Sequence, residues 1–561
     1  MPKHIIYQLL PRTFTNYNTD CVPNGTMEQN GCGKFNKITD KALLEIKRLG
    51  ATHIWFTGII EHATETDYTR FGIQKDNPKV IKGKAGSPYA IKDYYDVDPD
   101  LAEDIPHRMQ EFEALIHRTH DAGMQVVIDF VANHVARQYH SDAKPKDVVD
   151  LGETDHPEWA FSPLNNFYYL PGQTFSTEHI TNLSNEHYDE YPAKVTGNDC
   201  FNAAPNNNDW YETVKLNYGV HYQGGMEKQF MPLPNTWLKM REILLFWCSK
   251  GVDAFRCDMA EMVPVEFWGW VITEVKHQYP QTEFIAEVYN PRLYRSYIFD
   301  GHFDYLYDKV GMYDYLRSVT SHDYAAEGIT SQWQAVEDIQ SHMLYFLENH
   351  DEQRIASGFF CGNGLSAEPA MVVAACLGKN PVLIYAGQEI GEQGMDAEGF
   401  SGIDGRTTIF DYWGVKSLQA WANNGHFDGA LLNKEQKELR DFYSRLLNLS
   451  MNNKALKDGL MFDLEYVQNN NFNRHKQYAF LRKYNEETLL VIVNFDAREV
   501  EINVNIPPAA FTYLDMSVAE SVKWHDLLSE KDITTSCLKA DSPISIKVPA
   551  WKGLILQMQK L

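Results

Sequence analysis

The sequence has no surplus of positive charge. Its 51 lysines and arginines stand against 76 aspartates and glutamates, which leaves a formal net charge of −25 at pH 7. Nucleic-acid binding depends on basic residues that contact phosphates, so this balance argues against a nucleic-acid-binding protein. The charge is compatible with a neutral or cationic ligand, but it selects no particular one.

Cysteine motifs for metals and long apolar runs are also missing. The 8 cysteines include no Cys-x-x-Cys pair, so the spacing typical of a zinc cluster is absent. No apolar run is long enough to cross a bilayer, and the first residues, Met-Pro-Lys-His-Ile-Ile, contain no apolar signal region. We therefore expect a cytoplasmic protein without a membrane partner. A signal peptide that had already been removed would leave the same sequence.

The chain does have the length and the apolar content for more than one domain, with 561 residues of which 44% are hydrophobic. Short apolar runs alternate with amphipathic helical patterns along most of it. The strand candidates are residues 4–12, 52–58, 125–134, 252–258, 283–287, 303–306, 343–351 and 380–389. This alternation predicts an α/β fold, a (β/α)8 TIM barrel.

Two regions do not follow the alternation. Residues 135–235 are irregular and rich in Asn, Pro and Tyr, and they are far too long for a single crossover. They predict an inserted subdomain between the third strand and its helix. From residue 456 onward, strand-like runs and turns predict a C-terminal antiparallel β domain. The predicted domains are therefore a barrel (1–134 and 236–455), an insertion (135–235) and an all-β domain (456–561).

Charged residues follow several of the predicted strands. The run Gly251-Val-Asp-Ala-Phe-Arg-Cys-Asp258 ends with Arg256 and Asp258, which point the same way because side chains alternate along a strand. A structural ion pair would explain this stretch by itself. Other strand ends carry similar residues, however, namely Asp129, Asn133, His134, Glu287, His350 and Asp351. In a barrel, such ends line the face where active sites lie.

Four of these motifs together resemble the signature regions of the α-amylase family, glycoside hydrolase family 13. They are Asp129-Phe-Val-Ala-Asn-His134, Gly251 to Asp258, Ile285-Ala-Glu287 and Glu348-Asn-His-Asp351. The resemblance implies a retaining enzyme that hydrolyses α-1,4-linked glucans or maltooligosaccharides by double displacement. It implies Asp258 as the nucleophile, Glu287 as the general acid and base, and Asp351 as the group that holds and distorts the sugar.

The resemblance also implies substrate-binding residues and, for one residue, a metal. Arg256 would orient Asp258, and Tyr89 would stack beneath the reacting sugar, while Asp129, His134 and His350 would bind its hydroxyls. Tyr89, Asp129, His134 and His350 could each be structural instead. Asn133 resembles a calcium ligand of many amylases, but the insertion offers no clear partner carboxylates. We therefore expect no required cofactor and leave calcium open.

One departure from the family pattern follows the predicted nucleophile. The chain continues as Met-Ala-Glu-Met262, where many α-amylases have Lys-His, so we expect different contacts to the leaving sugar. A glucanotransferase of the same family is an open alternative, because hydrolysis and transfer share the glycosyl-enzyme. A non-catalytic glucan-binding or scaffold protein is disfavoured, because all three family acids are present.

Overall fold

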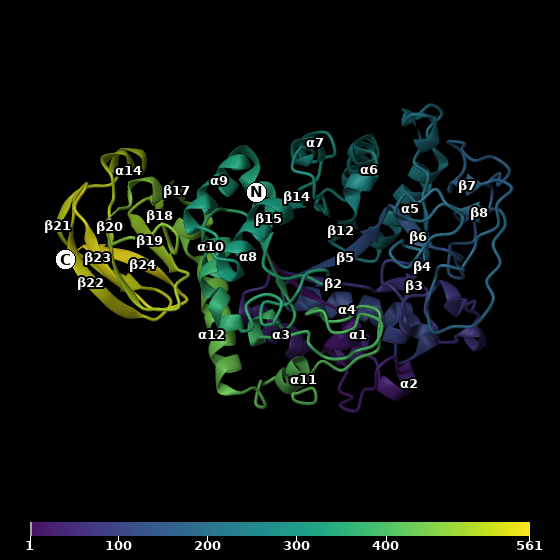
Figure 1. Ribbon diagram of the computed structural model, residues 1–561, viewed down its shortest axis with the longest axis horizontal. Coiled ribbons are helices and arrows are strands. Elements are labelled where there is room, and N and C mark those ends of the chain that lie inside the picture. The colour runs from purple at the N-terminus through teal and green to yellow at the C-terminus, as the bar shows by residue number, and fades with distance from the viewer. Residues whose placement is uncertain (1–2, 470, 561) are drawn as a thin grey trace.

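A computed structural model describes residues 3–469 and 471–560 of the chain. Eight parallel strands close into a barrel in the order β1-β16-β15-β14-β13-β12-β5-β2, which confirms the predicted (β/α)8 fold (Figure 1). These strands are β1 (Ile5–Leu9), β2 (His53–Phe56), β5 (Gln125–Val131), β12 (Ala254–Asp258), β13 (Glu283–Ala286), β14 (Tyr305–Tyr307), β15 (Met343–Phe346) and β16 (Val382–Tyr385). Each of them falls within or overlaps a predicted strand.

Most helices surround this barrel or connect its parts, and α14 lies in the C-terminal β domain. They are α1 (Pro11–Phe14), α2 (Met27–Asn30), α3 (Asp40–Leu49), α4 (Arg108–Asp121), α5 (Asn235–Ser249), α6 (Val265–Gln278), α7 (Tyr294–Phe299), α8 (Asp314–Ser321), α9 (Ile329–Ala335), α10 (Glu368–Cys376), α11 (Lys416–Ala422), α12 (Lys434–Asn452), α13 (Lys454–Lys457) and α14 (Pro508–Tyr513). Helix α3 shows why these segments pack as they do: its buried residues are Ala42, Leu43, Ile46 and Leu49, the spacing of one helix face. Among the described residues, no helix is long and apolar enough to cross a bilayer.

Between β5 and α5 the chain forms small antiparallel pairs instead of a crossover. They are β6 (His134–Ala136) with β9 (Thr213–Lys215), β7 (Tyr169–Leu170) with β8 (Ala193–Lys194), and β10 (Val220–His221) with β11 (Glu227–Lys228). A further pair, β3 (Ile60–His62) with β4 (Ile91–Val97), lies between β2 and α4 and was not predicted. In Figure 1, β7 and β8 lie on the side of the barrel away from the C-terminal sheet.

The last part of the chain forms an antiparallel sheet with its own apolar core, as predicted. Its strand order is β17-β18-β19-β24-β21-β22, and β20 and β23 form a second pair. The bounds are β17 (Leu460–Asp463), β18 (Gln477–Tyr484), β19 (Glu487–Asn494), β20 (Val500–Val504), β21 (Ala519–Asp526), β22 (Lys531–Leu538), β23 (Ile544–Val548) and β24 (Lys552–Lys560). Helices α10 and α12 lie between this sheet and the barrel strands (Figure 1).

The contact between sheet and barrel is polar as well as apolar. Arg482 of β18 is buried and donates five hydrogen bonds to backbone carbonyls, those of Cys376, Leu377, Ala455, Leu456 and Gly459. Helix α10, which ends at Cys376, is buried at every position. The guanidinium therefore satisfies carbonyls at the C-terminal ends of two barrel-side segments that would otherwise lack donors.

Candidate active site

Arg256 lies at the centre of the acidic cluster at the carboxyl ends of the barrel strands. Its side chain is fully buried, with Nη1 2.8 Å from Asp258 Oδ1 and 3.3 Å from Asp129 Oδ1. Its second terminal nitrogen, Nη2, is 2.8 Å from Glu287 Oε2. The guanidinium also donates from Nε to the Tyr307 hydroxyl at 3.2 Å. A buried arginine with three carboxylate partners fixes where those carboxylates lie.

Asp258 keeps one oxygen free of protein contacts. While Oδ1 is paired with Arg256, Oδ2 has no hydrogen-bond partner among the described residues. Burial raises the pKa of Asp258, Glu287 adds to the rise, and Arg256 opposes it. The charge of Arg256 thus favours the ionised form of Asp258, which a nucleophile needs.

Glu287 is held by donors on both oxygens. The backbone N–H of Met259 donates to Oε2 at 2.8 Å, and the Tyr289 hydroxyl donates to Oε1 at 2.5 Å. Met259 adopts a left-handed backbone conformation (φ 43°), which directs its N–H back toward the end of β13. Glu261 in turn accepts hydrogen bonds from the backbone N–H groups of Tyr289 and Asn290, at 3.1 and 3.0 Å. The segment Met-Ala-Glu-Met262, which departs from the family pattern, thus stabilises the loop that follows Glu287.

Tyr89, Asp129 and His350 form one hydrogen-bonded network beside this pair. The Tyr89 hydroxyl donates to Asp129 Oδ1 at 3.2 Å and lies 2.5 Å from His350 Nε2. The Gln8 amide donates to the other ring nitrogen, Nδ1, at 2.8 Å, which places the histidine proton on Nε2. Burial raises the pKa of Asp129 to about 6 and lowers that of His350 to about 3. The Nε2 proton of a neutral His350 therefore faces the Tyr89 hydroxyl and Asp351 Oδ2.

The remaining predicted residues line the same cavity, which has a volume of about 360 Å³. Asp351 is half-exposed to it, with Oδ2 3.1 Å from His350 Nε2. His134 is buried, and burial lowers its pKa to about 3. Its ring centroid lies 5.2 Å from that of Trp210. The cavity thus collects every predicted catalytic residue, and of the predicted substrate-binding residues Tyr89 and His134 line it directly.

The structure adds residues that the sequence did not indicate. Trp210 and Glu212 come from the insertion, Tyr289 follows β13, and Phe410 follows β16. Lys82 also lines the cavity, with Nζ 3.0 Å from Glu212 Oε2. Aromatic side chains on several sides offer apolar surfaces for sugar rings. Among these added residues, only Tyr289 could have been identified from the sequence, because it lies two positions after Glu287.

The surroundings of Asn133 do not fit the calcium site that the sequence left open. The carboxamide oxygen of Asn133 accepts a hydrogen bond from Lys215 Nζ at 2.7 Å. The same ammonium group lies 2.6 Å from Asp199 Oδ1. The amide nitrogen of Asn133 donates to the Gly197 carbonyl at 2.7 Å. The Lys215 ammonium group therefore occupies the place between these oxygens that a calcium ion would have to take.

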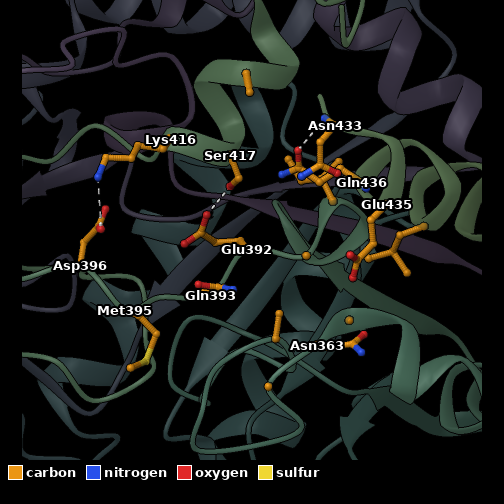
Figure 2. Close-up of a pocket in the computed structure, with 17 residues that line it drawn as sticks. Asn363, Glu392, Gln393, Met395, Asp396, Lys416, Ser417, Asn433, Glu435 and Gln436 are labelled. Atoms are coloured by element: carbon orange, nitrogen blue, oxygen red, sulfur yellow. Dashed lines mark hydrogen bonds and ion pairs between the residues drawn. The ribbon is translucent and has the colours of Figure 1, made fainter. Parts of the chain in front are cut away.

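A second cavity, of about 450 Å³, lies between the segment after β16 and helices α11 and α12. Figure 2 shows Glu392 directed toward Ser417, and Asp396 directed toward Lys416, an ion pair of 3.7 Å. The lining of this cavity shares no residue with that of the Asp258 cavity. It contains none of the predicted site residues.

A TIM barrel that gathers an arginine and several carboxylates at its strand ends, beside aromatic side chains, has the site of a glycoside hydrolase. Comparison with known families agrees. The family model described as "Alpha amylase, catalytic domain" matches residues 8–426. The chain belongs to this family and is a glycoside hydrolase.

Individual relatives are distant in sequence, and the share of each that matches this chain varies. Alpha-amylase 3 of Dictyoglomus thermophilum is 22% identical over 538 residues, which covers 89% of this chain and 86% of the relative. An alpha-1,4-glucan:maltose-1-phosphate maltosyltransferase of Cereibacter sphaeroides is 26% identical over 333 residues, covering 56% of this chain and 43% of that protein. The crystal structure of the Geobacillus thermoleovorans alpha-amylase complexed with acarbose has a TM-score of 0.64 at 17% identity, covering 99% and 98% of the two chains.

Proposed function

We propose that the Asp258 cavity cleaves α-1,4-glucosidic bonds of glucans or maltooligosaccharides with retention of configuration. One observation carries the proposal: Arg256 is paired with both Asp258 and Glu287, and Asp258 Oδ2 is left without a protein partner. A nucleophilic oxygen needs this freedom, and the rest of its carboxylate needs to be held in place. The alpha-amylases among the relatives support α-glucans as the substrate class.

In the first step, Asp258 Oδ2 attacks the anomeric carbon, and the bond from that carbon to the leaving oxygen breaks. Glu287 gives its proton to the leaving oxygen, so that the departing sugar leaves as a neutral alcohol. Arg256 balances negative charge in the cluster as the proton leaves Glu287. The product of this step is a glycosyl ester of Asp258.

In the second step, ionised Glu287 takes a proton from water, and the water oxygen attacks the anomeric carbon and releases Asp258. A sugar hydroxyl could replace the water, and the reaction would then be a transfer. Asp351 and the neutral imidazoles of His134 and His350 would bind the hydroxyls of the reacting sugar, with Tyr89 beside its ring. Lys215 makes calcium at Asn133 unnecessary, so we propose no metal requirement at that position.

Product analysis after incubation with maltooligosaccharides, soluble starch and pullulan tests the proposal. Wild type should release shorter glucans, and Asp258→Asn should lose activity by at least about 10³-fold, because an amide is a very poor nucleophile. Asp532→Asn, on the exposed edge of β22, is a matched control and should keep wild-type activity. Products longer than the substrate would identify transfer.

A rescue experiment tests the role of Asp258 more directly. Asp258→Gly leaves space for an external nucleophile, so azide should restore turnover of an activated α-glucoside and give a β-glucosyl azide. An azide product of α configuration would refute Asp258 as the nucleophile. If folded wild type acts on none of the α-glucans, the proposed substrate class is wrong.

A further inference from the structure

Three side chains of metal-ligating type meet at the amino-terminal end of the barrel, away from the catalytic strand ends. His4 immediately precedes β1, His53 begins β2, and Glu283 begins β13. Two residues after each of them lies a member of the apolar cluster inside the barrel, namely Ile6, Trp55 and Ile285. Because side chains alternate along a strand, His4, His53 and Glu283 also point inward. We call these three residues the basal cluster.

The distances within the basal cluster are those of a shared site. His4 Nε2 lies 3.1 Å from Glu283 Oε1, and His53 Nε2 lies 3.4 Å from Glu283 Oε2. One ligand atom from each of the three residues lies within 4.8 Å of the others. Ligands around a tetrahedral zinc ion, bound at about 2.0–2.1 Å, lie roughly 3.3 Å from one another. The cluster is thus close to the size that such an ion requires.

Thr52 offers a partner to the other ring nitrogen of His53. The Thr52 hydroxyl accepts from the Ile5 backbone N–H at 3.0 Å and lies 3.1 Å from the Ile5 carbonyl. Its oxygen also lies 2.8 Å from His53 Nδ1, where it can accept a proton from that ring nitrogen. In this tautomer His53 Nε2 presents a lone pair.

This lone pair is buried and faces a carboxylate. Only 2% of His53 is exposed, and Nε2 has no hydrogen-bond partner among the described residues. In the tautomer with its proton on Nδ1, Nε2 and the carboxylate oxygen 3.4 Å away both present lone pairs, and a cation between them would satisfy both. An imidazole whose second nitrogen donates to a fixed oxygen is also the usual form of a metal-ligating histidine.

We propose that His4, His53 and Glu283 bind a divalent zinc ion, with water as the fourth ligand. Two imidazole nitrogens and one carboxylate are ligands that zinc prefers, whereas calcium takes oxygen ligands. The His4 and Glu283 side chains are 12% and 21% exposed, so an ion and its water can reach the site from solvent. At neutral pH most histidines carry no proton on the ligating nitrogen, so binding requires little proton release.

The ion would connect parts of the barrel that do not pair with each other. Strands β1 and β2 are neighbours, but β13 lies on another part of the barrel wall. The zinc ion would bridge them across the barrel floor, in place of the apolar residues that usually fill it. Its role is therefore structural, and metal binding should raise the thermal stability without any need for a substrate.

The test titrates chelator-treated full-length protein with Zn²⁺ alone by calorimetry, and with Co²⁺ by visible absorption. We expect one zinc ion per chain, a higher Tm with zinc, and the absorption bands of four-coordinate cobalt. Glu283→Gln and His4→Asn should each weaken zinc binding by at least about 100-fold. His525→Asn is the matched control: it removes a histidine from the exposed pair with Asp532 on the C-terminal sheet and should bind zinc like wild type.

Two results would overturn the proposal. One is wild-type protein that binds no zinc under these conditions. The other is zinc binding of unchanged affinity in His4→Asn, because the ion would then lie elsewhere. Far-UV circular dichroism establishes that each variant is folded before titration. If Glu283→Gln does not fold, His4→Asn alone decides the result.

Discussion

Replacing Lys215 with methionine should destabilise the insertion. The Lys215 side chain is 2% exposed, and its ammonium group contacts Asn133 Oδ1 at 2.7 Å and Asp199 Oδ1 at 2.6 Å. These contacts join strand β9, the loop at Asp199 and the end of β5. Methionine has a similar length but no charge, so both oxygens would lose their donor.

The size of the effect follows from the exposure of the two partners. Breaking a fully buried ion pair costs about 3–5 kcal/mol. Because the Asp199 side chain is 35% exposed, water replaces much of its contact with Lys215, and we assign about 1 kcal/mol to the loss of this ion pair. The oxygen of Asn133, which is 1% exposed, contributes about 1–3 kcal/mol as an unsatisfied buried acceptor. The sum is about 3 kcal/mol.

Denaturant unfolding and thermal denaturation measure this change. Lys228→Met is a matched control. Lys228 lies in the same insertion and pairs with Glu266 of α6, but its side chain is 51% exposed, so this substitution should change stability by less than about 1 kcal/mol. In an Asp199→Asn background, Lys215→Met should cost less than in wild type. Equal stability of Lys215→Met and wild type would refute the reasoning.

Three further predictions concern the catalytic cluster and the pH dependence of stability. Arg256→Lys keeps the charge but cannot span Asp258 and Glu287, so kcat should fall at least about 100-fold; a smaller loss in steady-state assays would contradict the bridging role. Burial raises the pKa of Tyr289, so its hydroxyl stays protonated and donates to Glu287, and Tyr289→Phe should lower kcat about 10-fold with intact folding. A kcat equal to that of wild type would show that this hydrogen bond is dispensable. Burial also raises the pKa of Glu398 to about 9, so its stabilising effect is complete below pH 4.5 and is lost as the pH rises toward 9. The Tm of wild type relative to Glu398→Gln should therefore fall between pH 5 and 9, and a constant difference would show that Glu398 is ionised throughout.

The sequence predicted the barrel and its acidic cluster because both leave local signals. The barrel strands are short apolar runs, and the buried residues of helix α5, such as Met240, Leu244 and Trp247, recur at helical spacing. Arg256 and Asp258 break an apolar run at its end, which is visible without any tertiary information. The same is true of Glu287, which follows β13 directly, and of Asp351, which ends the apolar run that begins with β15.

The contacts that the sequence could not predict join residues far apart in the chain. Lys215 meets Asn133 across 82 positions, and no local pattern marks either as the partner of the other. Trp210 reaches the cavity only because the insertion folds back over the barrel. The pair β3–β4 was missed because β3 has 3 residues, too few for a periodic pattern to show.

The hydrogen bonds of Arg482 affect where the chain can be truncated. The sequence changes character near residue 456, and a truncation there would look natural. The carbonyls of Cys376, Leu377 and Ala455 would then lose the Arg482 donor, and burial of this arginine in the contact lowers its pKa to about 10. The apolar side of α10 would be uncovered at the same time. We therefore expect barrel and sheet to unfold as one cooperative unit, and an isolated barrel to aggregate instead of serving as a minimal enzyme.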